Sequence, residues 1–570
     1  MRAAGIDAGV TDHVVVEVSR RGRMLVGEPI FTPGVPIPLD KHGLGDLGAG
    51  DLAVVRKQRG RARLERSLGP ADRIENVLQA LLEHEGLRHE FEPFDLPKPN
   101  FEGRSDLREL LTFTIDPETA KDFDDAISTR REGDGIRVWV HIADVSWFVP
   151  AGSPLDRGAA ERALSVYVPG FVAPMLPHEL SDDACSLRPN VERLCVTVEV
   201  LFDGSLQAGE PTFYRSVIRS NERLTYGQAE SILAGREHAP DDLTEGLRLA
   251  ETISLELRRR RFARGALRIA GAEIAFAFDG DGGVEKAWLE SEPHAHALIE
   301  ELMILANEAV AGLLAGRRRE ALFRVHERPE PLSVTRLLAK LTSVEVPTPP
   351  APDADHMTPE QAAKIAAEAS ERVSEYVAHA TRGKEAFPSL VLRALKQARY
   401  HPQNLGHSGL ASTAYCHFTS PIRRYPDLVV HRALLREIGA TDDPLPEDLE
   451  AAAEHCSVKE REAGEVEYRA DDIVAAWLLE DVLFERGWEE PFVGEITGMI
   501  GSGLFIRFGD VFEGYLPARR LPGDYYEIDA LETRLVGRRG GRIFRLGDPI
   551  DVRVQEIRKN EGKVELSLAG

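Results

Sequence analysis

The sequence is poor in cysteine and has no long apolar run. Only Cys185, Cys195, Cys416 and Cys456 occur among its 570 residues, and no two of them form a Cys-x-x-Cys pair. This scarcity argues against a disulfide framework and against a structural zinc site. No stretch approaches the roughly 18 consecutive apolar residues of a membrane span, and the start lacks the pattern of a secretory leader. We therefore expect a protein of the cytoplasm.

An excess of positive charge is also lacking. The chain has 70 Lys and Arg residues against 94 Asp and Glu residues, for a formal net charge of −24. Residues 1–85 and 491–570 are each neutral, with 12 basic and 12 acidic residues, so the whole excess lies in the centre. An acidic surface repels phosphate unless basic stripes or metal ions intervene. The centre therefore either avoids polyanions or holds cations where it meets them.

What the chain does have is the composition of a folded α+β protein of several domains. Its apolar fraction is 43% and its charged fraction 29%, which excludes fibrous and mainly disordered chains. We expect boundaries at 1–86, 87–490 and 491–570. Residues 14–18 and 52–57 are apolar runs of strand length, which predict a small N-terminal barrel, and the apolar spacing of 71–86 predicts a trailing helix.

The basic residues of the N-terminal region gather in one stretch. Six of them fall within eleven positions: Arg56, Lys57, Arg59, Arg61, Arg63 and Arg66. Two interpretations stay open, a solvated surface strand and a patch that contacts phosphates beside the barrel.

The last 80 residues are again rich in strands and glycines. About five short strands predict a closed OB-type barrel, a fold that often binds single-stranded nucleic acid. Seven aromatic residues are interleaved there with Arg507, Arg519 and Arg520, namely Phe492, Phe505, Phe508, Phe512, Tyr515, Tyr525 and Tyr526. We expect half or more of them in the barrel core and the remainder to be available for base stacking.

The central region alternates strands and helices, which predicts a mixed α/β domain. Residues 136–145 and 196–202 read as strands, and 295–316 and 445–485 as helices. The sequence Thr358-Pro359-Glu360-Gln361 has the pattern of a helix start with a capping box.

The strongest chemical signal is TFTIDPETAKDFDDAIS, residues 112–128. Four acids, Asp116, Asp122, Asp124 and Asp125, lie within ten residues and inside an apolar frame. Carboxylates this close repel one another unless cations bind between them. Oxygen-only ligands favour Mg²⁺ or Mn²⁺, and a pair of such ions is the usual means of phosphodiester cleavage. A solvated acidic loop is the alternative, while an EF-hand does not match the spacing.

A second motif is HFTSPIRRYPDLVVHR, residues 417–432. Its adjacent Arg423 and Arg424 predict a clamp on a substrate phosphate, because they stand in an otherwise acidic domain. A surface ion pair is the alternative for such a pair of arginines.

These segments resemble the RNase II/RNase R (RNB) exoribonucleases. The segment TIDPETAKDFDDA is similar to the metal-site signature of that family, aspartate for aspartate. Further similar blocks follow in the family's order: VHIADVSWFV, YVPGFVAPMLPHELSDDACSL (167–187), FRVHERP (323–329) and NLGHSGLASTAYCHFTSPIRRYPDLVVHR (404–432). The resemblance covers roughly 100–490, and the last 80 residues are similar to an S1 RNA-binding domain.

The resemblance implies a processive 3′→5′ exoribonuclease that hydrolyses single-stranded RNA to nucleoside 5′-monophosphates, in RNA decay or 3′-end processing. Two Mg²⁺ ions, for which Mn²⁺ can substitute, would be held by Asp116, Asp122, Asp124 and Asp125, and loss of Asp124 would abolish cleavage while RNA still binds. Arg423 would contact the scissile phosphate, and Arg424 would bind RNA beside it.

The resemblance also implies roles for an aromatic and for a helix acid. Tyr167 would stack on the 3′-terminal base, with a buried core tyrosine as the alternative. The helix acid that assists catalysis stays open among Glu465, Glu467 and Asp471.

Two departures from the family pattern are visible. The N-terminal region has room for one cold-shock-type barrel and a helix, and the lysine-rich tail of RNase R-type members is not seen, which favours closeness to RNase II. We also expect a monomer. Two other functions stay open. The protein could bind RNA without cleaving it, or it could be a structural partner in an RNA-processing complex.

Overall fold

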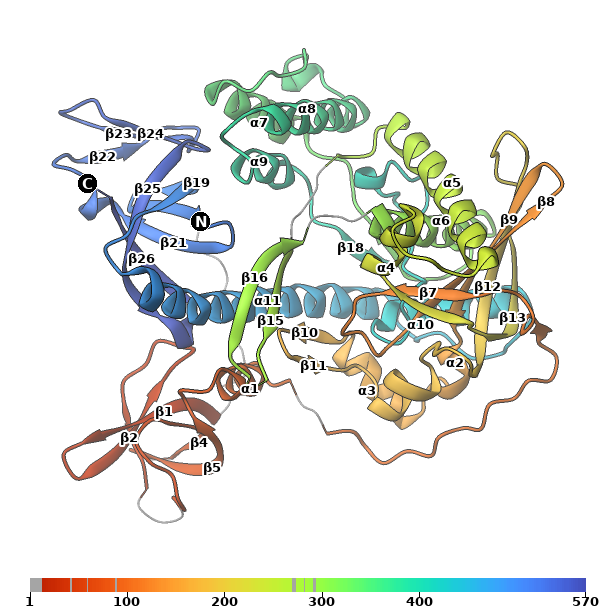
Figure 1. Cartoon of the computed structure of the whole chain (residues 1–570), viewed down its shortest axis with the longest axis horizontal. Coiled ribbons are helices and arrows are strands. Elements are labelled where there is room, and N and C mark those ends of the chain that lie inside the picture. Colours follow the sequence, from red (N-terminus) through yellow and green to blue (C-terminus); the bar gives the residue numbers. More distant parts are fainter. Residues whose placement is uncertain are drawn as a thin grey trace.

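The computed structural model describes residues 13–40, 44–58, 60–87, 90–268, 273–280, 282–290 and 294–569. An N-terminal sheet, a central α/β region and a C-terminal barrel follow one another along the chain (Figure 1). The helix α11 (Leu449–Arg486) contacts elements of all three. Among the described residues, no helix combines the length and apolarity that a bilayer crossing requires.

The N-terminal sheet has five strands, in the order β3-β2-β1-β4-β5. They are β1 (His13–Arg21), β2 (Met24–Pro29), β3 (Ile37–Pro38), β4 (Asp51–Gln58) and β5 (Arg61–Pro70), and α1 (Ile74–His84) follows. A bridge between Leu39 and Ala62 brings the two edges together, as in an OB-like unit. The strands predicted at 14–18 and 52–57 and the helix within 71–86 are confirmed.

The basic stretch lies on the β4–β5 hairpin of this unit. Its exposed members are Arg56, Lys57, Arg61, Arg63 and Arg66, while Arg59 lies outside the described residues. On β5 the buried Ala62 alternates with its exposed arginine neighbours, as the two-residue period of a strand requires. Arg66 forms an ion pair with Glu83 of α1.

The central region is built on a seven-stranded sheet of order β14-β7-β8-β9-β12-β13-β6. Its strands are β6 (Ser105–Asp106), β7 (Phe113–Asp116), β8 (Asp125–Glu132), β9 (Gly135–Ala143), β12 (Glu192–Phe202), β13 (Thr212–Arg219) and β14 (Glu222–Thr225). The helices α5 (Asp241–Ala263) and α6 (His294–Gly316) pack on it, with α4 (Tyr226–Leu233) beside them. Residues 136, 138, 140 and 142 of β9 all enter the core shared with these helices, while the residues between them face the other side.

The central region also contains helices and strands outside this sheet. They are α2 (Val145–Phe148), α3 (Pro154–Arg162), β10 (Val166–Val168), β11 (Phe171–Ala173), β15 (Glu273–Phe278), β16 (Val284–Glu290) and α10 (Tyr425–Glu437). Between β17 (Phe323–Val325) and β18 (Arg399–His401) stand three helices, α7 (Pro331–Ser343), α8 (Pro359–His379) and α9 (Ala386–Ala394). The predicted capping box opens α8, because Thr358 and Gln361 bond each other's backbone N–H groups at 2.9 and 3.2 Å.

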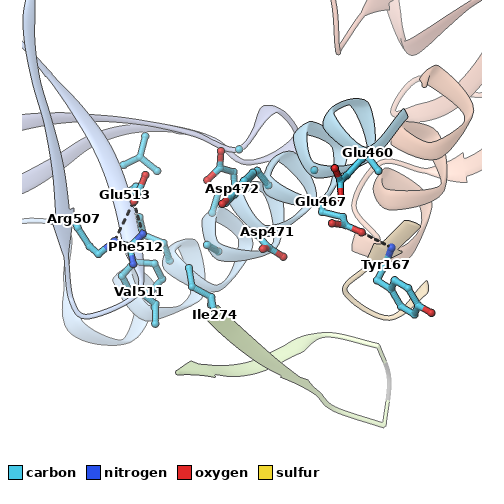
Figure 2. Close-up of a pocket in the computed structure, with 18 of the residues that line it drawn as sticks. Tyr167, Ile274, Glu460, Glu467, Asp471, Asp472, Arg507, Val511, Phe512 and Glu513 are labelled. Atoms are coloured by element: carbon cyan, nitrogen blue, oxygen red, sulfur yellow. Dashed lines mark hydrogen bonds and ion pairs between the residues drawn. The ribbon is translucent and has the colours of Figure 1, made fainter. Parts of the chain in front are cut away.

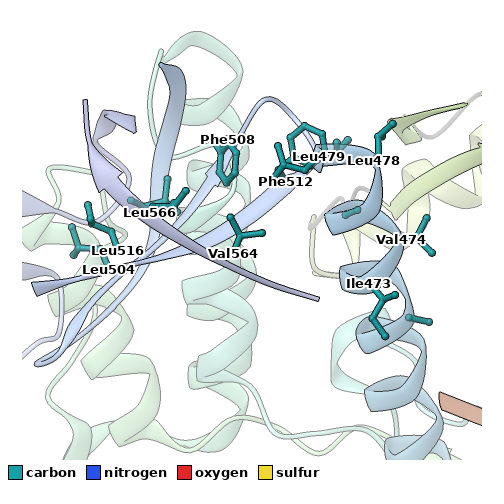
Figure 3. Close-up of a cluster of buried hydrophobic side chains, with 14 of the residues drawn as sticks. Ile473, Val474, Leu478, Leu479, Leu504, Phe508, Phe512, Leu516, Val564 and Leu566 are labelled. Carbon is teal, nitrogen blue, oxygen red and sulfur yellow. The ribbon is translucent and has the colours of Figure 1, made fainter. Parts of the chain in front are cut away.

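The C-terminal unit is a closed five-stranded barrel of order β19-β20-β21-β26-β25. Its strands are β19 (Phe492–Ile500), β20 (Gly503–Phe508), β21 (Phe512–Pro517), β25 (Pro549–Arg558) and β26 (Lys563–Leu568), with a three-stranded sheet of β22 (Tyr526–Ile528), β23 (Arg534–Gly537) and β24 (Ile543–Arg545) inserted. Figure 3 shows its core side chains beside those of α11. The expectation that half or more of the seven aromatics are buried is confirmed by Phe492, Phe508, Phe512 and Tyr526. Phe505 and Tyr525 are exposed, and base stacking by such residues stays a prediction.

The barrel is held to the helical unit through Glu495 of β19. Its carboxylate accepts the backbone N–H groups of Lys384, Glu385 and Ala386 at 2.9, 3.2 and 2.9 Å, at the start of α9. The first N–H groups of a helix lack intrahelical acceptors and carry partial positive charge, so an anion there is stabilising. An ion pair between Arg382 and Asp548 reinforces the contact.

We predict that Glu495→Ala loosens the barrel, because three helix-end N–H groups lose their acceptor. The expected loss is about 1–2 kcal/mol, as for a removed helix cap. Thermal unfolding and limited proteolysis measure it, with the exposed Glu490→Ala as the matched control. Equal melting and cleavage of the two variants would contradict this account of the docking.

Candidate active site

The four predicted acids lie together at one end of the central sheet. Asp116 ends β7, Asp125 begins the neighbouring antiparallel β8, and Asp122 and Asp124 lie in the connection between them. Phe113, Ile115, Phe123, Ala126 and Ile127, which frame the acids in the sequence, are all buried. This apolar frame anchors the segment and leaves Asp116 only 9% and Asp124 only 4% exposed. The segment is therefore not a solvated acidic loop.

Burial raises the pKa of three of these carboxyl groups. The pKa of Asp116 rises to about 6 and that of Asp125 to about 7, and the pKa of Asp124 lies well above its ordinary value. Loss of water disfavours the charged form, and neighbouring carboxylates add to the rise. The positive charge of Arg423 acts on all three in the opposite direction.

The donor set suits a hard divalent cation. It consists of carboxylate oxygens alone, the ligands that Mg²⁺ and Mn²⁺ prefer. One oxygen of Asp116 and one of Asp124 are buried without a hydrogen-bond partner, which leaves two acceptor positions for an ion to satisfy. Within the described ranges, no three acidic, His or Cys side chains already form a group that could hold a metal. Binding would therefore require the carboxylates to move closer together.

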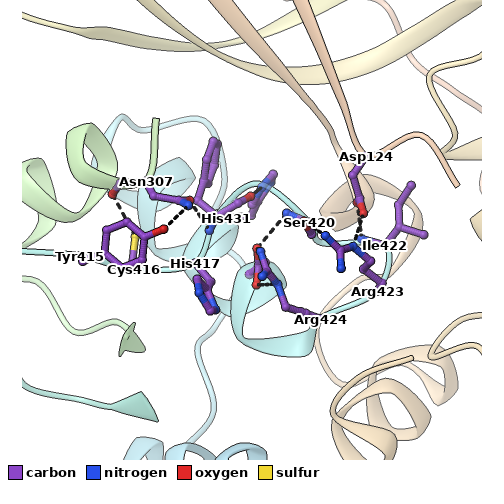
Figure 4. A network of polar contacts seen from close by, with 12 residues as sticks. Asp124, Asn307, Tyr415, Cys416, His417, Ser420, Ile422, Arg423, Arg424 and His431 are labelled. Atoms are coloured by element: carbon purple, nitrogen blue, oxygen red, sulfur yellow. Dashed lines mark hydrogen bonds and ion pairs between the residues drawn. The ribbon is translucent and has the colours of Figure 1, made fainter. Parts of the chain in front are cut away.

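Arg423 faces the acidic segment from the loop before α10 (Figure 4). The backbone N–H of Ile422 donates to Asp124 at 2.9 Å, and Nε of Arg423 lies 3.5 Å from the other oxygen of Asp124. The guanidinium also donates to Ser420 Oγ at 3.0 Å, yet its side chain stays 44% exposed. Arg423 can therefore contact Asp124 and a solvent-borne anion together.

Arg424 has a different environment from its neighbour. Its guanidinium donates two hydrogen bonds, of 2.9 and 2.8 Å, to the fully buried carboxylate of Asp427, which also accepts the N–H of Ser420. Such a bidentate pair fixes geometry as well as charge. Arg424 borders the cavity described below, but its charge is used to hold the loop that carries Arg423.

The same loop is fixed from α6 and α10 by residues that the sequence did not single out. Asn307 accepts the N–H of Phe418 at 2.9 Å and donates to the hydroxyl of Tyr415 at 3.0 Å. His431 donates through Nε2 to the carbonyl of Phe418 at 2.8 Å, and burial lowers its pKa to about 4, so it is neutral. For Asn307 no signal in the sequence marked this role, whereas His431 lies within the 417–432 motif.

Tyr167 connects the acidic segment with α11. Its hydroxyl donates to Asp122 at 2.6 Å, and its backbone N–H donates to Glu467 at 2.8 Å. Burial raises the pKa of the hydroxyl, which therefore stays protonated. Of the three candidate helix acids, Glu467 and Asp471 line the neighbouring cavity and Glu465 does not.

A cavity of about 820 Å³ extends from Arg423 and Tyr167 to the C-terminal barrel (Figure 2). One face of α11 forms its wall, and Arg507, Phe512 and Glu513 of β20 and β21 close the far end. The charged residues of this wall are all acidic, namely Glu460, Glu467, Asp471 and Asp472 along the helix. The cavity thus leads from the barrel to Tyr167 and Arg423, the residues that contact Asp122 and Asp124.

This arrangement has known counterparts. The RNB domain family matches residues 104–439 of the chain. The chain belongs to the RNB family. Nucleases of the RNB family are metal-dependent hydrolases.

Ribonucleases R of several bacteria are similar to this RNB chain. The one from Escherichia coli is 36% identical over 493 residues, 83% of this chain and 58% of that protein. The one from Aquifex aeolicus is 37% identical over 486 residues, 84% of this chain and 66% of that protein. The structure of Mycoplasma genitalium RNase R in complex with ribose-methylated single-stranded RNA matches with a TM-score of 0.85 at 26% identity, covering 98% of this chain and 89% of that one.

The RNB chain spans less than two thirds of the length of the two curated relatives. Because the relatives above are named ribonuclease R, they give no support to the expected closeness to RNase II.

We predict that the stability of the metal-free RNB protein falls as pH rises from about 4 to 7. The folded state keeps protons on Asp116 and Asp125 that the unfolded chain has already released, so this stability is present at low pH and lost through pH 6–7. A bound divalent cation needs deprotonated ligands, so Mg²⁺ stabilises at pH 8 and hardly at pH 5. At a concentration about 100 times its Kd it adds about 2.7 kcal/mol.

Thermal melts at pH 5 and pH 8, with and without Mg²⁺, check this prediction. Asp116→Asn combined with Asp125→Asn should reduce both effects strongly, and Asp510→Asn, at an exposed position of the barrel, should keep them in full. An equal rise in Tm with Mg²⁺ at the two pH values would speak against these carboxylates as the ligands.

Proposed function

We propose that the protein is a 3′→5′ exoribonuclease that hydrolyses single-stranded RNA processively to nucleoside 5′-monophosphates, in RNA decay or 3′-end processing. The observation that carries this proposal is the contact of Arg423 with the buried Asp124 at the end of the long cavity. The similarity to RNase R, and to an RNase R structure bound to single-stranded RNA, supports the substrate class.

The acids and the arginine would share the chemistry. Asp116, Asp122, Asp124 and Asp125 would hold two Mg²⁺ ions, with Mn²⁺ able to substitute, and such ions activate water and neutralise the leaving oxygen. Arg423 would bind the scissile phosphate and stabilise the charge that develops on it, since a guanidinium stays protonated. The buried oxygen of Asp124 lies beside this guanidinium, so the acid and the phosphate clamp are already aligned.

Tyr167 and Glu467 would position the end of the strand. The hydroxyl of Tyr167 is held by Asp122 and its backbone by Glu467, so the ring is fixed beside the acids. We propose that it stacks on the 3′-terminal base, with Glu467 as the helix acid of the site. Arg424 is then a positioning residue for Arg423, and an RNA contact of its own is a secondary role.

The outer parts of the chain would bind the strand upstream. Phe505 and Tyr525 are exposed on the C-terminal unit, where an aromatic face can stack on a base. We propose units at 1–86, 87–490 and 491–570, of which the first and last grip RNA around the catalytic unit. Monomeric state and a cytoplasmic location remain predictions, the latter in keeping with four buried free thiols.

A first experiment tests the reaction itself. A 5′-labelled single-stranded RNA with Mg²⁺ should give a ladder that shortens from the 3′ end to a small labelled product. Asp124→Asn should bind the RNA without shortening it, and DNA of the same sequence should stay intact. If the wild-type protein retards RNA in a gel and never shortens it, the chain is a binding relative instead of a nuclease.

A second experiment separates the two neighbouring arginines. Arg423→Ala should lower kcat by about 10²–10³-fold, as for the loss of one transition-state donor, and should lower the melting temperature less than Arg424→Ala does, because Arg423 is partly exposed. Arg424→Ala should instead cost about 3–5 kcal/mol of stability, because it leaves Asp427 buried and unpaired. Steady-state kinetics and denaturation of both variants check this, and an exchange of the two phenotypes would refute the assigned roles.

A further inference from the structure

Tyr468 of α11 stands out among the residues that line the long cavity. The lining residues of this helix recur every three or four positions, which places them on one face: Glu460, Ala463, Gly464, Glu467, Tyr468, Asp471, Asp472, Ala475, Ala476 and Leu479. Most of these residues are acidic or small. Tyr468 is the large aromatic side chain on this face, and it is 77% exposed. A ring of this size left open in a cavity wall presents a surface for a flat ligand.

The position of Tyr468 along the helix is set by contacts on both sides. Glu467, the preceding residue, accepts the N–H of Tyr167 at the catalytic end. Four residues after Tyr468, Asp472 packs closely against Gly562 of the barrel. A Cβ on this glycine would lie 2.8 Å from Cβ of Asp472. At a rise of 1.5 Å per residue, these two contacts are about 7.5 Å apart along α11. Tyr468 therefore lies between the catalytic end of the cavity and its barrel end.

The charges around Tyr468 decide which side of a nucleic acid strand can face it. Glu467, Asp471 and Asp472 share its wall (Figure 2), and carboxylates repel phosphates. Hydroxyl and amino groups of riboses and bases can instead donate to carboxylates. A strand in the cavity must therefore turn its bases and riboses toward α11 and its phosphates away. An aromatic ring on this wall then meets bases.

We propose that Tyr468 is a base-stacking residue for a nucleotide upstream of the one held at Tyr167, and that it contributes to holding the strand between successive cleavages. This inference rests on the proposed function. Stacking on an aromatic side chain tolerates every base, because each base has a π face. Tyr468 is thus a sequence-independent contact that adds affinity for RNA long enough to reach it.

The test measures binding in the full-length chain carrying Asp124→Asn, which keeps the RNA intact. In this background, Tyr468→Ala should weaken binding of a single-stranded RNA about 5-fold to 150-fold, the range that one lost stacking contact predicts. Tyr468→Trp should restore the binding. Phe484→Ala is the matched control, since Phe484 is 72% exposed on the same helix and does not line the cavity. It should bind like the parent.

Abasic nucleotides identify the base that stacks. RNAs with one abasic site, moved step by step from the 3′ end, should show one internal position where the abasic site weakens binding to the parent and not to Tyr468→Ala. In the protein with Asp124 intact, Tyr468→Ala should also shorten the run of cleavages per binding event. The same loss at every abasic position in both proteins, or equal binding by Tyr468→Ala and Phe484→Ala, would overturn the inference.

The wild-type ladder separates this failure from failure of the proposed function. If wild-type protein shortens RNA from the 3′ end while Tyr468→Ala binds and digests like wild type, only the role of Tyr468 is refuted. If wild-type protein neither binds nor shortens RNA, the proposed function fails and this inference fails with it.

Discussion

The repulsion among four closely spaced carboxylates, two of them buried, is the constraint on which the site depends. Asp116, Asp124 and Asp125 are each made more basic by burial, and each is relieved by the same guanidinium, that of Arg423. Arg423 compensates this charge only in part, because two buried oxygens keep no hydrogen-bond partner. Such an arrangement is unfavourable for the protein alone, and cations and a phosphate bound there, as proposed, would offset the charge.

The loop that carries Arg423 has to be rigid for this compensation to work. Its backbone is bonded at Phe418 by Asn307 and His431, at Ser420 by Asp427 and at Ile422 by Asp124. These four partners come from α6, α10 and the acidic segment. The loop therefore cannot shift without breaking contacts with all three. The second arginine of the motif belongs to this support. A guanidinium placed in this way needs little reorganisation when an anion arrives.

The helix α11 forms the wall of a cavity that extends from Tyr167 and Arg423 to the C-terminal barrel. It carries Glu467 at the catalytic end and contacts the C-terminal barrel five residues further on. The barrel is fixed in turn to the helical unit through Glu495 and the start of α9. Because both ends of the cavity are tied to the same helix, their spacing is set by helix geometry. In the proposed function, the acidic residues between them would repel the phosphates of a strand and leave its bases and riboses to face α11.

Local patterns in the sequence determined much of this. Apolar runs of strand length predicted β1 and β9, and alternation with glycines predicted the barrel strands. The capping box predicted the start of α8, and the apolar frame argued against a solvated acidic loop, in keeping with the burial of Asp116 and Asp124. These signals work because strands, caps and turns depend on neighbours within a few positions. Only the tertiary structure decided that Glu467 meets Tyr167 across 300 residues, that Asp427 takes the charge of Arg424, and that Asn307 supports the loop. Contacts between distant segments depend on how elements pack, and periodicity within one segment carries no information about its partner.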